Sequence, residues 1–266
     1  MTEEILKKIK QLPPLPESAM KIEAVYQDPD SSFNDMVKIL EKDPLLTADI
    51  LKAANSPLYG FSREINAISQ AVGLFGMGTV RGFALASIVK KSFKLNLAPY
   101  GISNDMFSML SKKQHGLMTA WCIRKENKLL GVLSPAAFLV EIGKVLIAQQ
   151  IIADEKEEEF RDALIELQDV EAAERKVVGV DTPEVSATIF KQWKFEGSLI
   201  GVIGSCLNPQ EAEPQDIKPA SILHVVRVAV PINGVVTDES IKQAKELIEK
   251  YNLDMPSFDD AIENAR

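Results

Sequence analysis

Few residues of this chain could do acid–base or metal chemistry, and the most unusual of them is Glu141. It lies in AFLVEIGKVLIAQQ, residues 137–150, where nearly every neighbour before and after it is apolar. A carboxylate among apolar side chains is unfavourable unless it is paired, protonated or bound to a metal ion. Glu141 is therefore the first candidate for a functional group.

The other candidates for chemistry are weaker. The chain has two histidines, His115 and His224, which could join Glu141 in a mononuclear site with two histidines and one carboxylate. Such histidines are more often ordinary core or surface residues, and we prefer that interpretation. A serine nucleophile finds no support, because no GxSxG motif is present and Ser205 lies in an apolar stretch beside Cys206.

The glycine-rich stretch GLFGMGTVRG, residues 73–82, precedes an apolar helical pattern and superficially resembles a phosphate-binding loop. It lacks both the preceding strand and the GK[ST] ending that such loops require. We interpret its glycines as allowing a tight turn and the close approach of another helix.

Composition and charge narrow the class of protein. The 266 residues carry a net charge of −8, which argues against a basic face for nucleic acid and against docking on an anionic membrane. The two cysteines, Cys122 and Cys206, form no CxxC motif and are expected to be reduced core thiols. The charged N-terminus is not a secretory signal, and no uninterrupted apolar run of about 18 residues occurs. These features predict a soluble, cytoplasmic protein.

The hydrophobic pattern has the helical period almost everywhere, as in Phe33, Met36, Val37 and Leu40. Strand-like alternation is nearly absent, so we predict an all-α protein of roughly a dozen helices. Helix starts are indicated by a capping side chain before a proline or by a capping box. The predicted starts are Ser32 with Asp35, Asp43 with Pro44, Ser134 with Pro135, and Thr182 with Pro183.

A boundary is expected within residues 94–103, where Pro99 and Gly101 interrupt the helical pattern and Ser103 could cap the next helix. It divides the chain into an N-terminal helical part, residues 1–98, and a second helical part, residues 99–266.

Three motifs in the first half, in this order and spacing, resemble the HDOD output domain, a bacterial signalling relative of the HD phosphohydrolases. They are LPPLPESAMKI, DPLLTADILKAANSPLYG and ISQAVGLFGMGTVRGFAL. The resemblance extends over roughly residues 8–235. It implies a multi-helical fold whose second part, residues 99–266, is a degenerate HD-like unit, and it implies signal output in bacteria, often linked to two-component systems, cyclic-dinucleotide signalling or motility.

The most specific part of the resemblance contains Asp43, Pro44, Asn55, Ser56, Tyr59 and Gly60. Asn55 and Ser56, followed by Pro57, would end the helix that begins at Pro44. We favour a packing role for this segment. The alternative is that Asn55, Tyr59 and Arg63 line a groove that holds a partner.

The HD superfamily builds its metal site from a first histidine, an adjacent His-Asp pair and a later aspartate. By the resemblance, His115 falls at the first histidine and Val140-Glu141 at the His-Asp pair. Arg227 takes the place of the late aspartate, and Thr182 stands where a further histidine occurs in catalytic relatives. Valine cannot ligate a metal ion, and a guanidinium opposes a bound cation. We therefore expect no metal cofactor and no catalytic residues.

The resemblance also suggests a role for Glu141. If the helical stretches 135–150 and 219–230 face each other as in the family, Glu141 and Arg227 could form an ion pair inside the former metal site. The rival interpretation is that Glu141 lies at the rim of its helix and reaches solvent.

Three functions remain open from the sequence. The preferred one is a non-catalytic signal-transduction module that contacts other proteins, with unknown signalling partners and neither nucleic acid nor membrane as a partner. The second is a residual metal-dependent phosphohydrolase acting on nucleotides or cyclic dinucleotides. The third is a small-molecule sensor that uses the former metal pocket, where Arg227 and Lys144 could attract an anion.

Overall fold

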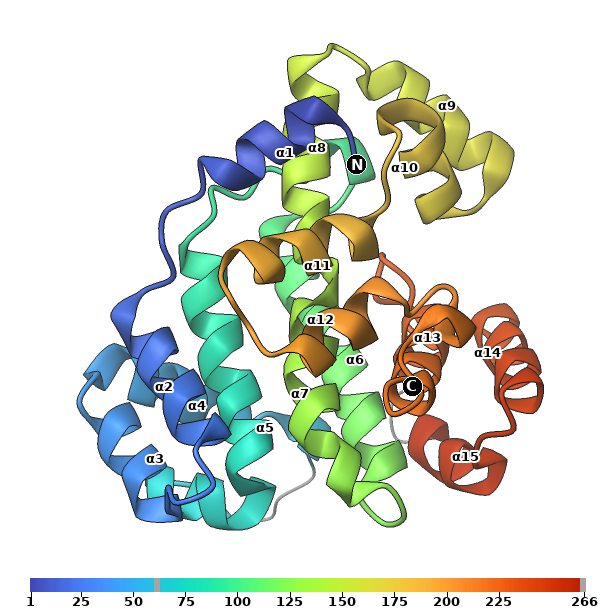
Figure 1. The fold of residues 1–266 in the computed structure, drawn as a ribbon. Coiled ribbons are helices and arrows are strands. Elements are labelled where there is room, and N and C mark those ends of the chain that lie inside the picture. Colours follow the sequence, from blue (N-terminus) through green and yellow to red (C-terminus); the bar gives the residue numbers. More distant parts are fainter. Residues whose placement is uncertain (60–62, 264–266) are drawn as a thin grey trace.

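The computed structural model describes residues 1–59 and 63–263, and this part of the chain is built from helices without a strand (Figure 1). The α-helices are α1 (Glu3–Lys10), α2 (Glu17–Gln27), α3 (Phe33–Glu41), α4 (Pro44–Ala54), α5 (Ile68–Lys91), α6 (Asn104–Cys122), α7 (Leu130–Leu139), α8 (Gly143–Ala153), α9 (Glu157–Leu167), α10 (Val170–Val178), α11 (Thr182–Gln192), α12 (Gly197–Gly204), α13 (Ile217–Ala229), α14 (Asp238–Lys250) and α15 (Met255–Glu263). Short 3-10 turns are η1 (Pro57–Tyr59), η2 (Ala98–Tyr100), η3 (Asn127–Leu129), η4 (Val140–Ile142) and η5 (Pro209–Glu211). The all-α prediction is confirmed, and the described residues form fifteen α-helices rather than a dozen because several have only eight or nine residues.

Several predicted helix starts are confirmed by their hydrogen bonds. The Asp43 carboxylate accepts from the backbone N–H groups of Leu45 and Leu46 at the start of α4. The Ser103 hydroxyl accepts from the N–H of Met106 at the start of α6. Ser32 and Asp35 form the capping box of α3. These side chains satisfy N–H groups that a helix cannot satisfy internally.

Two predicted starts are wrong. Helix α11 is capped by Asp181, whose carboxylate accepts from the N–H of Glu184, so Thr182 is the first helical residue. Ser134 and Pro135 start no helix, because α7 begins at Leu130 and Pro135 lies inside it.

A proline inside a helix leaves one carbonyl without its usual N–H donor. For Pro135 this is the carbonyl four residues earlier, at Gly131. The buried guanidinium of Arg81 donates to that carbonyl at 3.2 Å. Arg81 also binds both carboxylate oxygens of Glu23, at 2.6 and 2.8 Å, and Glu196 at 3.1 Å. One buried side chain on α5 therefore satisfies the free carbonyl of α7 and links α7 to α2 and to the segment before α12.

Helices α5 and α7 lie very close to each other, and glycines make this possible. A Cβ atom on Gly78 would lie 2.7 Å from the Cα atom of Gly131, and one on Gly82 would lie 2.6 Å from the Ser134 hydroxyl. Gly76 has a φ of 79° and kinks α5. The predicted close helix approach is confirmed, whereas the predicted turn before a helix is a kink inside α5, which already begins at Ile68.

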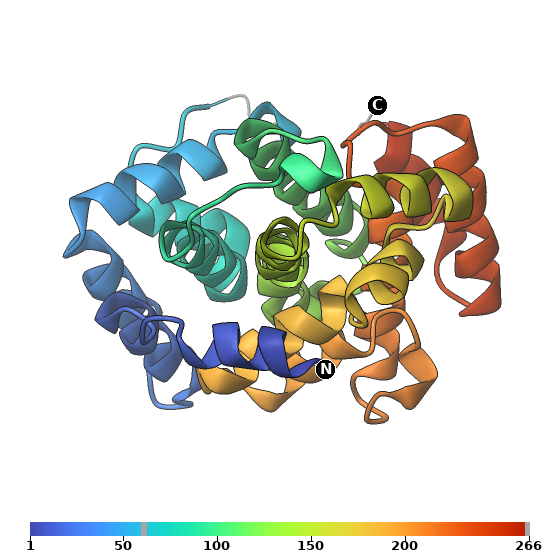
Figure 2. The same cartoon turned by 90° about the horizontal axis from the view of Figure 1, so that it is seen from above.

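Helices α7 and α8, joined by η4, run through the middle of the molecule, where Figure 2 shows them surrounded by the other helices. Within the described residues, two segments are long and apolar enough to cross a membrane, Ile68–Lys91 and Asn127–Ala153. Their most apolar windows are 61% and 83% buried against the rest of the fold, as expected for core helices.

The segment predicted to contain a boundary is an interruption between helices. It contains η2, and Gly101 there has a φ of 69°. Helices α5 and α7, which lie on either side of this segment in the sequence, nevertheless pack directly against each other. The N-terminal and C-terminal parts thus share one core.

Candidate functional site

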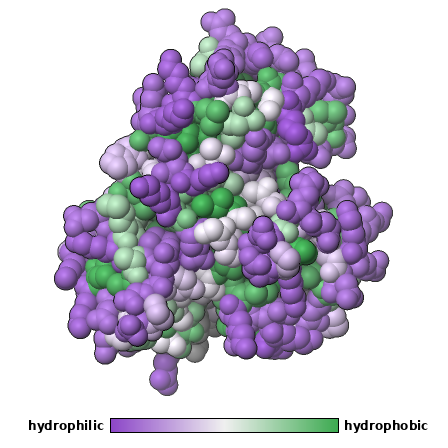
Figure 3. All heavy atoms as spheres, viewed as in Figure 1, coloured by the Kyte–Doolittle hydropathy of each residue, from purple (hydrophilic) through white to green (hydrophobic). Residues whose placement is uncertain are grey.

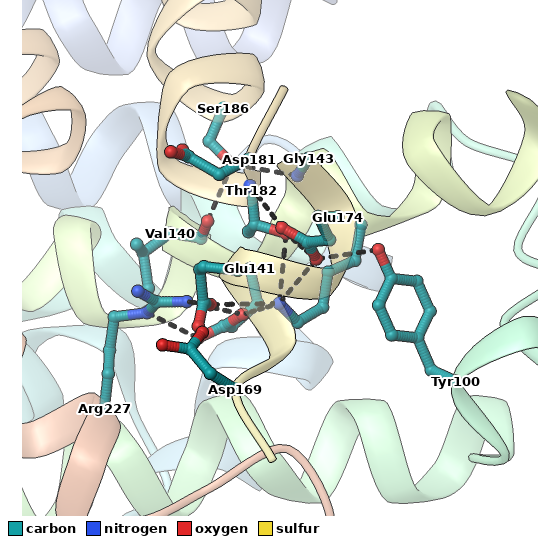
Figure 4. Close-up of polar contacts among 12 residues, drawn as sticks. Tyr100, Val140, Glu141, Gly143, Asp169, Glu174, Asp181, Thr182, Ser186 and Arg227 are labelled. Atoms are coloured by element: carbon teal, nitrogen blue, oxygen red, sulfur yellow. Dashed lines mark hydrogen bonds and ion pairs between the residues drawn. The ribbon is translucent and has the colours of Figure 1, made fainter. Parts of the chain in front are cut away.

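Charged and polar side chains from six elements meet where α6, α8, α10, α11 and α13 surround the turn η4 (Figure 4). They are Gln114, Glu141, Lys144, Glu171, Glu174, Thr182 and Arg227, which we call the central network. The turn η4 interrupts the helical stretch from α7 to α8 with a tighter 3-10 geometry. Such an interruption often marks a functional position.

Glu141 and Arg227 form the ion pair suggested by the sequence. The Arg227 Nε atom lies 2.8 Å from Glu141 Oε1, and Nη2 lies 3.3 Å from Oε2. The side chains are 4% and 6% exposed, so the pair is buried and Glu141 does not reach solvent at a helix rim. Gln114 donates to the same Glu141 Oε1 atom at 3.2 Å. Arg227 also binds Glu171 on α10.

Lys144 is the second cation of the central network. Its Nζ atom lies 3.1 Å from Glu141 Oε2, 3.1 Å from Glu174 Oε1 and 3.5 Å from Glu171 Oε1. It lies one helical turn after Glu141, so the same stretch of chain supplies both a carboxylate and its counter-ion. The sequence analysis considered Lys144 as an attractor of anions, whereas the structure surrounds it with carboxylates.

Thr182 connects the central network to α11. Its backbone N–H and its hydroxyl each donate to Glu174 at 2.6 Å, and the hydroxyl accepts from Lys144 at 3.0 Å. The Tyr100 hydroxyl donates to Glu174 at 2.8 Å. Thr182 therefore binds a carboxylate as a hydrogen-bond donor, a role different from that of a metal ligand.

The packing around Val140 leaves little space. Val140 is fully buried, and its carbonyl accepts from the Ser186 hydroxyl at 2.6 Å. The same hydroxyl accepts from the N–H of Gly143 at 2.8 Å. A Cβ atom on Gly143 would lie 2.5 Å from the Thr182 carbonyl oxygen. These contacts fix η4 against α11 and hold Glu141 in place.

The network shifts the pKa values of its carboxyl groups in both directions. Burial alone would raise the pKa of Glu141, but Arg227 and Lys144 outweigh burial and hold it below its ordinary value. The same cations, again against burial, lower the pKa of Glu171 to about 2. Burial and the neighbouring Glu171 raise the pKa of Glu174. Glu141 and Glu171 are therefore ionised at neutral pH.

His115, which by the resemblance falls at the first metal-ligating histidine, is not part of this network. Its Nδ1 atom lies 2.6 Å from the Tyr59 hydroxyl, its Nε2 atom lies 2.8 Å from the Ser134 hydroxyl, and its ring stacks on Phe138. Burial lowers its pKa to about 3, so the ring is neutral. The preceding residue, Gln114, contacts Glu141 instead, because neighbouring residues point in different directions from a helix.

The possible site of two histidines and Glu141 is likewise not assembled. His224 lies beside Tyr251, with 3.0 Å between its Nδ1 atom and the hydroxyl, while His115 points into the core elsewhere. In residues 1–59 and 63–263, no three His, Cys, Asp or Glu side chains are arranged to hold a metal ion.

The motif residues after α4 have packing contacts. The Asn55 side-chain amide donates to the Ile65 carbonyl and its oxygen accepts from the Ile65 N–H, so it closes the loop between them. Tyr59 packs edge-on against Phe75 and Phe83. Ser56 is half-buried, and Arg63 is exposed. Gly60 lies outside the described residues.

A cavity of about 660 Å³ opens onto the central network. Its lining includes Glu141, Lys144, Glu171, His224 and Arg227. It lies where α10, α13 and α14 approach one another, on the side where the space-filling outline in Figure 3 is indented between the α9–α10 region and the α13–α14 region. The charged groups of the network thus form the inner wall of a solvent-accessible pocket.

Comparison with known proteins identifies the fold. The profile of the HDOD domain family matches residues 12–209. The chain belongs to the HDOD family. This confirms the resemblance seen in the sequence, over a slightly shorter range than the predicted residues 8–235.

Several solved structures share this fold over nearly their whole length. A protein named "Putative phosphohydrolase" from Shewanella amazonensis superposes with a TM-score of 0.74 at 24% identity, covering 99% of this chain and 94% of that one. A virulence factor from Campylobacter jejuni gives 0.58 at 27% identity, with coverage of 99% and 100%. An HDOD domain protein of unknown function from Geobacter sulfurreducens gives 0.67 at 16% identity, with coverage of 99% and 96%.

One curated relative of this HDOD chain, an uncharacterized protein from Treponema pallidum, is 32% identical over 73 residues. The match covers 27% of this chain and 14% of the relative, so the chain spans only a small part of that protein's length.

The metal ion of the HD superfamily does not fit the residues of this HDOD chain. Val140, the neighbour of Glu141, has no atom that can ligate a metal ion. The Arg227 and Lys144 cations both contact the Glu141 carboxylate, at 2.8 and 3.1 Å, and they also bind Glu171 and Glu174. A divalent ion placed beside Glu141 would be repelled by these two cations and would compete with them for every carboxylate of the network.

The central network also predicts how the stability of this protein depends on pH. Glu141 and Glu171 have folded-state pKa values below the ordinary glutamate value of 4.5, so their contribution is present above that value and is lost as pH falls through the folded-state values. The raised pKa of Glu174 acts in the opposite sense and partly offsets them. We expect the urea midpoint to fall as pH is lowered from 4.5 toward about 2.

Glu171→Gln should flatten this dependence, because it removes one of the depressed carboxyl groups. Glu166→Gln is the matched control, since Glu166 pairs with Lys176 on the surface and is 65% exposed. A Glu171→Gln curve parallel to that of the wild type would contradict the assignment.

Proposed function

We propose that this HDOD chain is a non-catalytic signal-transduction module that acts by binding other proteins, with the metal site of the HD phosphohydrolases replaced by a network of side chains. The observation that carries the proposal is the contact of both Arg227 and Lys144 with the Glu141 carboxylate. Two cations held against this carboxylate would oppose the divalent ion, with its ligands and bound water, that a hydrolytic enzyme of this superfamily needs.

The network suits a structural role better than a chemical one. Arg227 and Lys144 are held by three carboxylates, and Glu174 receives four hydrogen-bond donors from Tyr100, Lys144 and Thr182. Groups held this tightly have little freedom to transfer protons or to rearrange around a substrate. A module of this kind would work in the cytoplasm of a bacterium and receive its signal from a separate protein, such as a two-component or motility protein.

A residual phosphohydrolase is the alternative, and the name of the Shewanella amazonensis structure points that way. The two functions differ in metal content and turnover. We expect purified protein, incubated with Mn²⁺, Mg²⁺ or Zn²⁺ and then desalted, to retain metal far below one ion per chain. We also expect no hydrolysis of a generic phosphodiester or of a cyclic dinucleotide.

If metal binding or hydrolysis is observed, a variant must show that it occurs at the central network. Stoichiometric metal, together with hydrolysis that a chelator abolishes and added metal restores, would overturn the proposal. Gln114→Ala tests the location, because Gln114 contacts Glu141 without carrying charge; loss of turnover in that variant would place the reaction here. Lys191→Ala, at an exposed position on α11, is the control.

A further inference from the structure

A second cavity, which we call the lysine cleft, lies between α4, α5, α6 and α7 and has a volume of about 330 Å³. Its wall includes Lys52, Lys90, Lys91 and Lys112, together with the aromatic rings of Phe83 and Phe138. It shares no lining residue with the cavity over the central network.

The charge of the lysine cleft is opposite to that of the whole chain. Asp49 is the one acidic residue in its lining, and its carboxylate is bound by Lys91 at 2.7 Å and by the Ser87 hydroxyl. Within the described residues, the ammonium groups of Lys52, Lys90 and Lys112 form no salt bridge or hydrogen bond, although Lys90 lies over the ring of Phe107. In the part of the chain that the structure describes, three lysines that form no salt bridge thus line one cleft of a protein whose net charge is −8.

Of these three lysines, Lys90 gives the clearest physical reason for an anion to bind in the cleft. It is half-buried on α5, and burial together with the nearby Lys112 lowers its pKa to about 8. Holding an ammonium group partly out of water and beside another cation is unfavourable. A bound anion would remove that repulsion.

The cavity over the central network offers no comparable site, because Arg227 and Lys144 are already paired with carboxylates. The volume of the lysine cleft is in the range of small-ligand pockets, and its aromatic rings offer an apolar surface. Lysines bind phosphate as point charges, and a phosphate monoester, with nearly two negative charges at neutral pH, suits several unpaired cations better than a carboxylate with one.

We propose that the lysine cleft binds a small organic phosphate, with the phosphate group among the three unpaired lysines and the apolar part of the ligand against Phe83 and Phe138. This inference goes beyond the proposed function and does not depend on it, since the cleft is separate from the former metal site. Ligand binding here would give the module a chemical input of its own.

The test is calorimetric titration of the full chain with four probes: phenyl phosphate, inorganic phosphate, phenol and benzoate. We expect phenyl phosphate to bind at least about tenfold tighter than each of the others, because only it supplies both the phosphate and the ring. Adenosine monophosphate is a fifth probe; tighter binding than phenyl phosphate would assign the ligand to nucleotides, and weaker binding would assign it to simpler aryl phosphates.

Lys90→Met and Lys112→Met should each weaken phenyl phosphate binding at least about tenfold, and Lys191→Met, on the exposed face of α11, should leave it unchanged. Wild-type affinity should also fall as pH rises through about 8, where Lys90 loses its proton, and Lys90→Met should remove that change. The charged groups that share the lining with Lys90 are Asp49, Lys52, Lys91 and Lys112.

The proposal is overturned if no phosphate probe binds, if benzoate binds as tightly as phenyl phosphate, or if both lysine variants bind like the wild type. Circular dichroism and the urea midpoint of each variant establish that a loss of binding is not a loss of folding. None of these outcomes bears on metal content or hydrolysis, so the failure of this proposal can be told apart from failure of the proposed function.

Discussion

Glu141→Gln and Arg227→Met should each destabilise the protein strongly, by about 3 to 5 kcal/mol if the remaining partner stays buried and unpaired. The physical reason is that each substitution leaves a largely buried charge without the partner that it contacts most closely. Glu171 stays beside Arg227 in the first variant, and Lys144 stays beside Glu141 in the second, so the lower end of that range is expected. Urea denaturation of the single and double variants measures the effect.

The double variant should cost much less than the sum of the two single variants, because it leaves neither charge behind. The surface pair of Glu166 and Lys176 is the control, with side chains 65% and 46% exposed. The same cycle there should give a coupling energy below about 1 kcal/mol. Simple additivity at Glu141 and Arg227 would show that the two side chains do not stabilise each other.

Arg81→Met is expected to have an effect of similar size, about 3 to 5 kcal/mol, because it removes the partner of a buried carboxylate. Arg81 is fully buried and contacts Glu23, Glu196 and the Gly131 carbonyl that Pro135 leaves without a donor. Its guanidinium also lies 4.2 Å from the centre of the Tyr26 ring. Met fills the space but satisfies none of these acceptors.

Arg81→Lys separates charge from geometry. An ammonium group keeps the positive charge but cannot bind Glu23 through two parallel hydrogen bonds while also reaching Gly131. We expect it to recover only part of the loss, as measured by the urea midpoint. If Arg81→Lys were as stable as the wild type, the charge alone would matter, and the hydrogen bond to the Gly131 carbonyl would contribute nothing to stability.

Local signals predicted the helices well. The caps at Asp43 and Ser103 and the box at Ser32 were readable because each involves a side chain within three residues of the N–H that it binds. Pro135 was misread because the donor that makes it tolerable, Arg81, is more than fifty residues away. No local pattern carries that information.

The candidate site was predictable in part. The pair of Glu141 and Arg227 could be expected from an apolar surrounding and a family resemblance. Gln114 was missed because histidine is the more conspicuous ligand and the helix places the two neighbours on different sides. Glu171 and Glu174 were missed because α10 looks like an ordinary amphipathic surface helix. The sequence did contain one indication of this burial. Ala173 and Val177 are apolar at helical spacing, and Glu174 is buried together with them in α10.

The two cavities differ in whether their lysine and arginine side chains are paired with carboxylates. In one, Lys144 and Arg227 are neutralised by glutamates and hold helices together. In the other, Lys90 and Lys112 form no salt bridge with any described residue. The proposed function therefore assigns a structural role to the first set of cations, and the further proposal assigns anion binding to the second.

The contacts of Arg81 have a consequence for synthesis on the ribosome. Its acceptors at Gly131 and Glu196 follow it in the chain by 50 and 115 residues. The first five helices can therefore form early, but their central guanidinium stays only partly satisfied until the chain has grown well past residue 196. Nascent chains arrested before that point should be open to proteases, and protection should arise late and in one step.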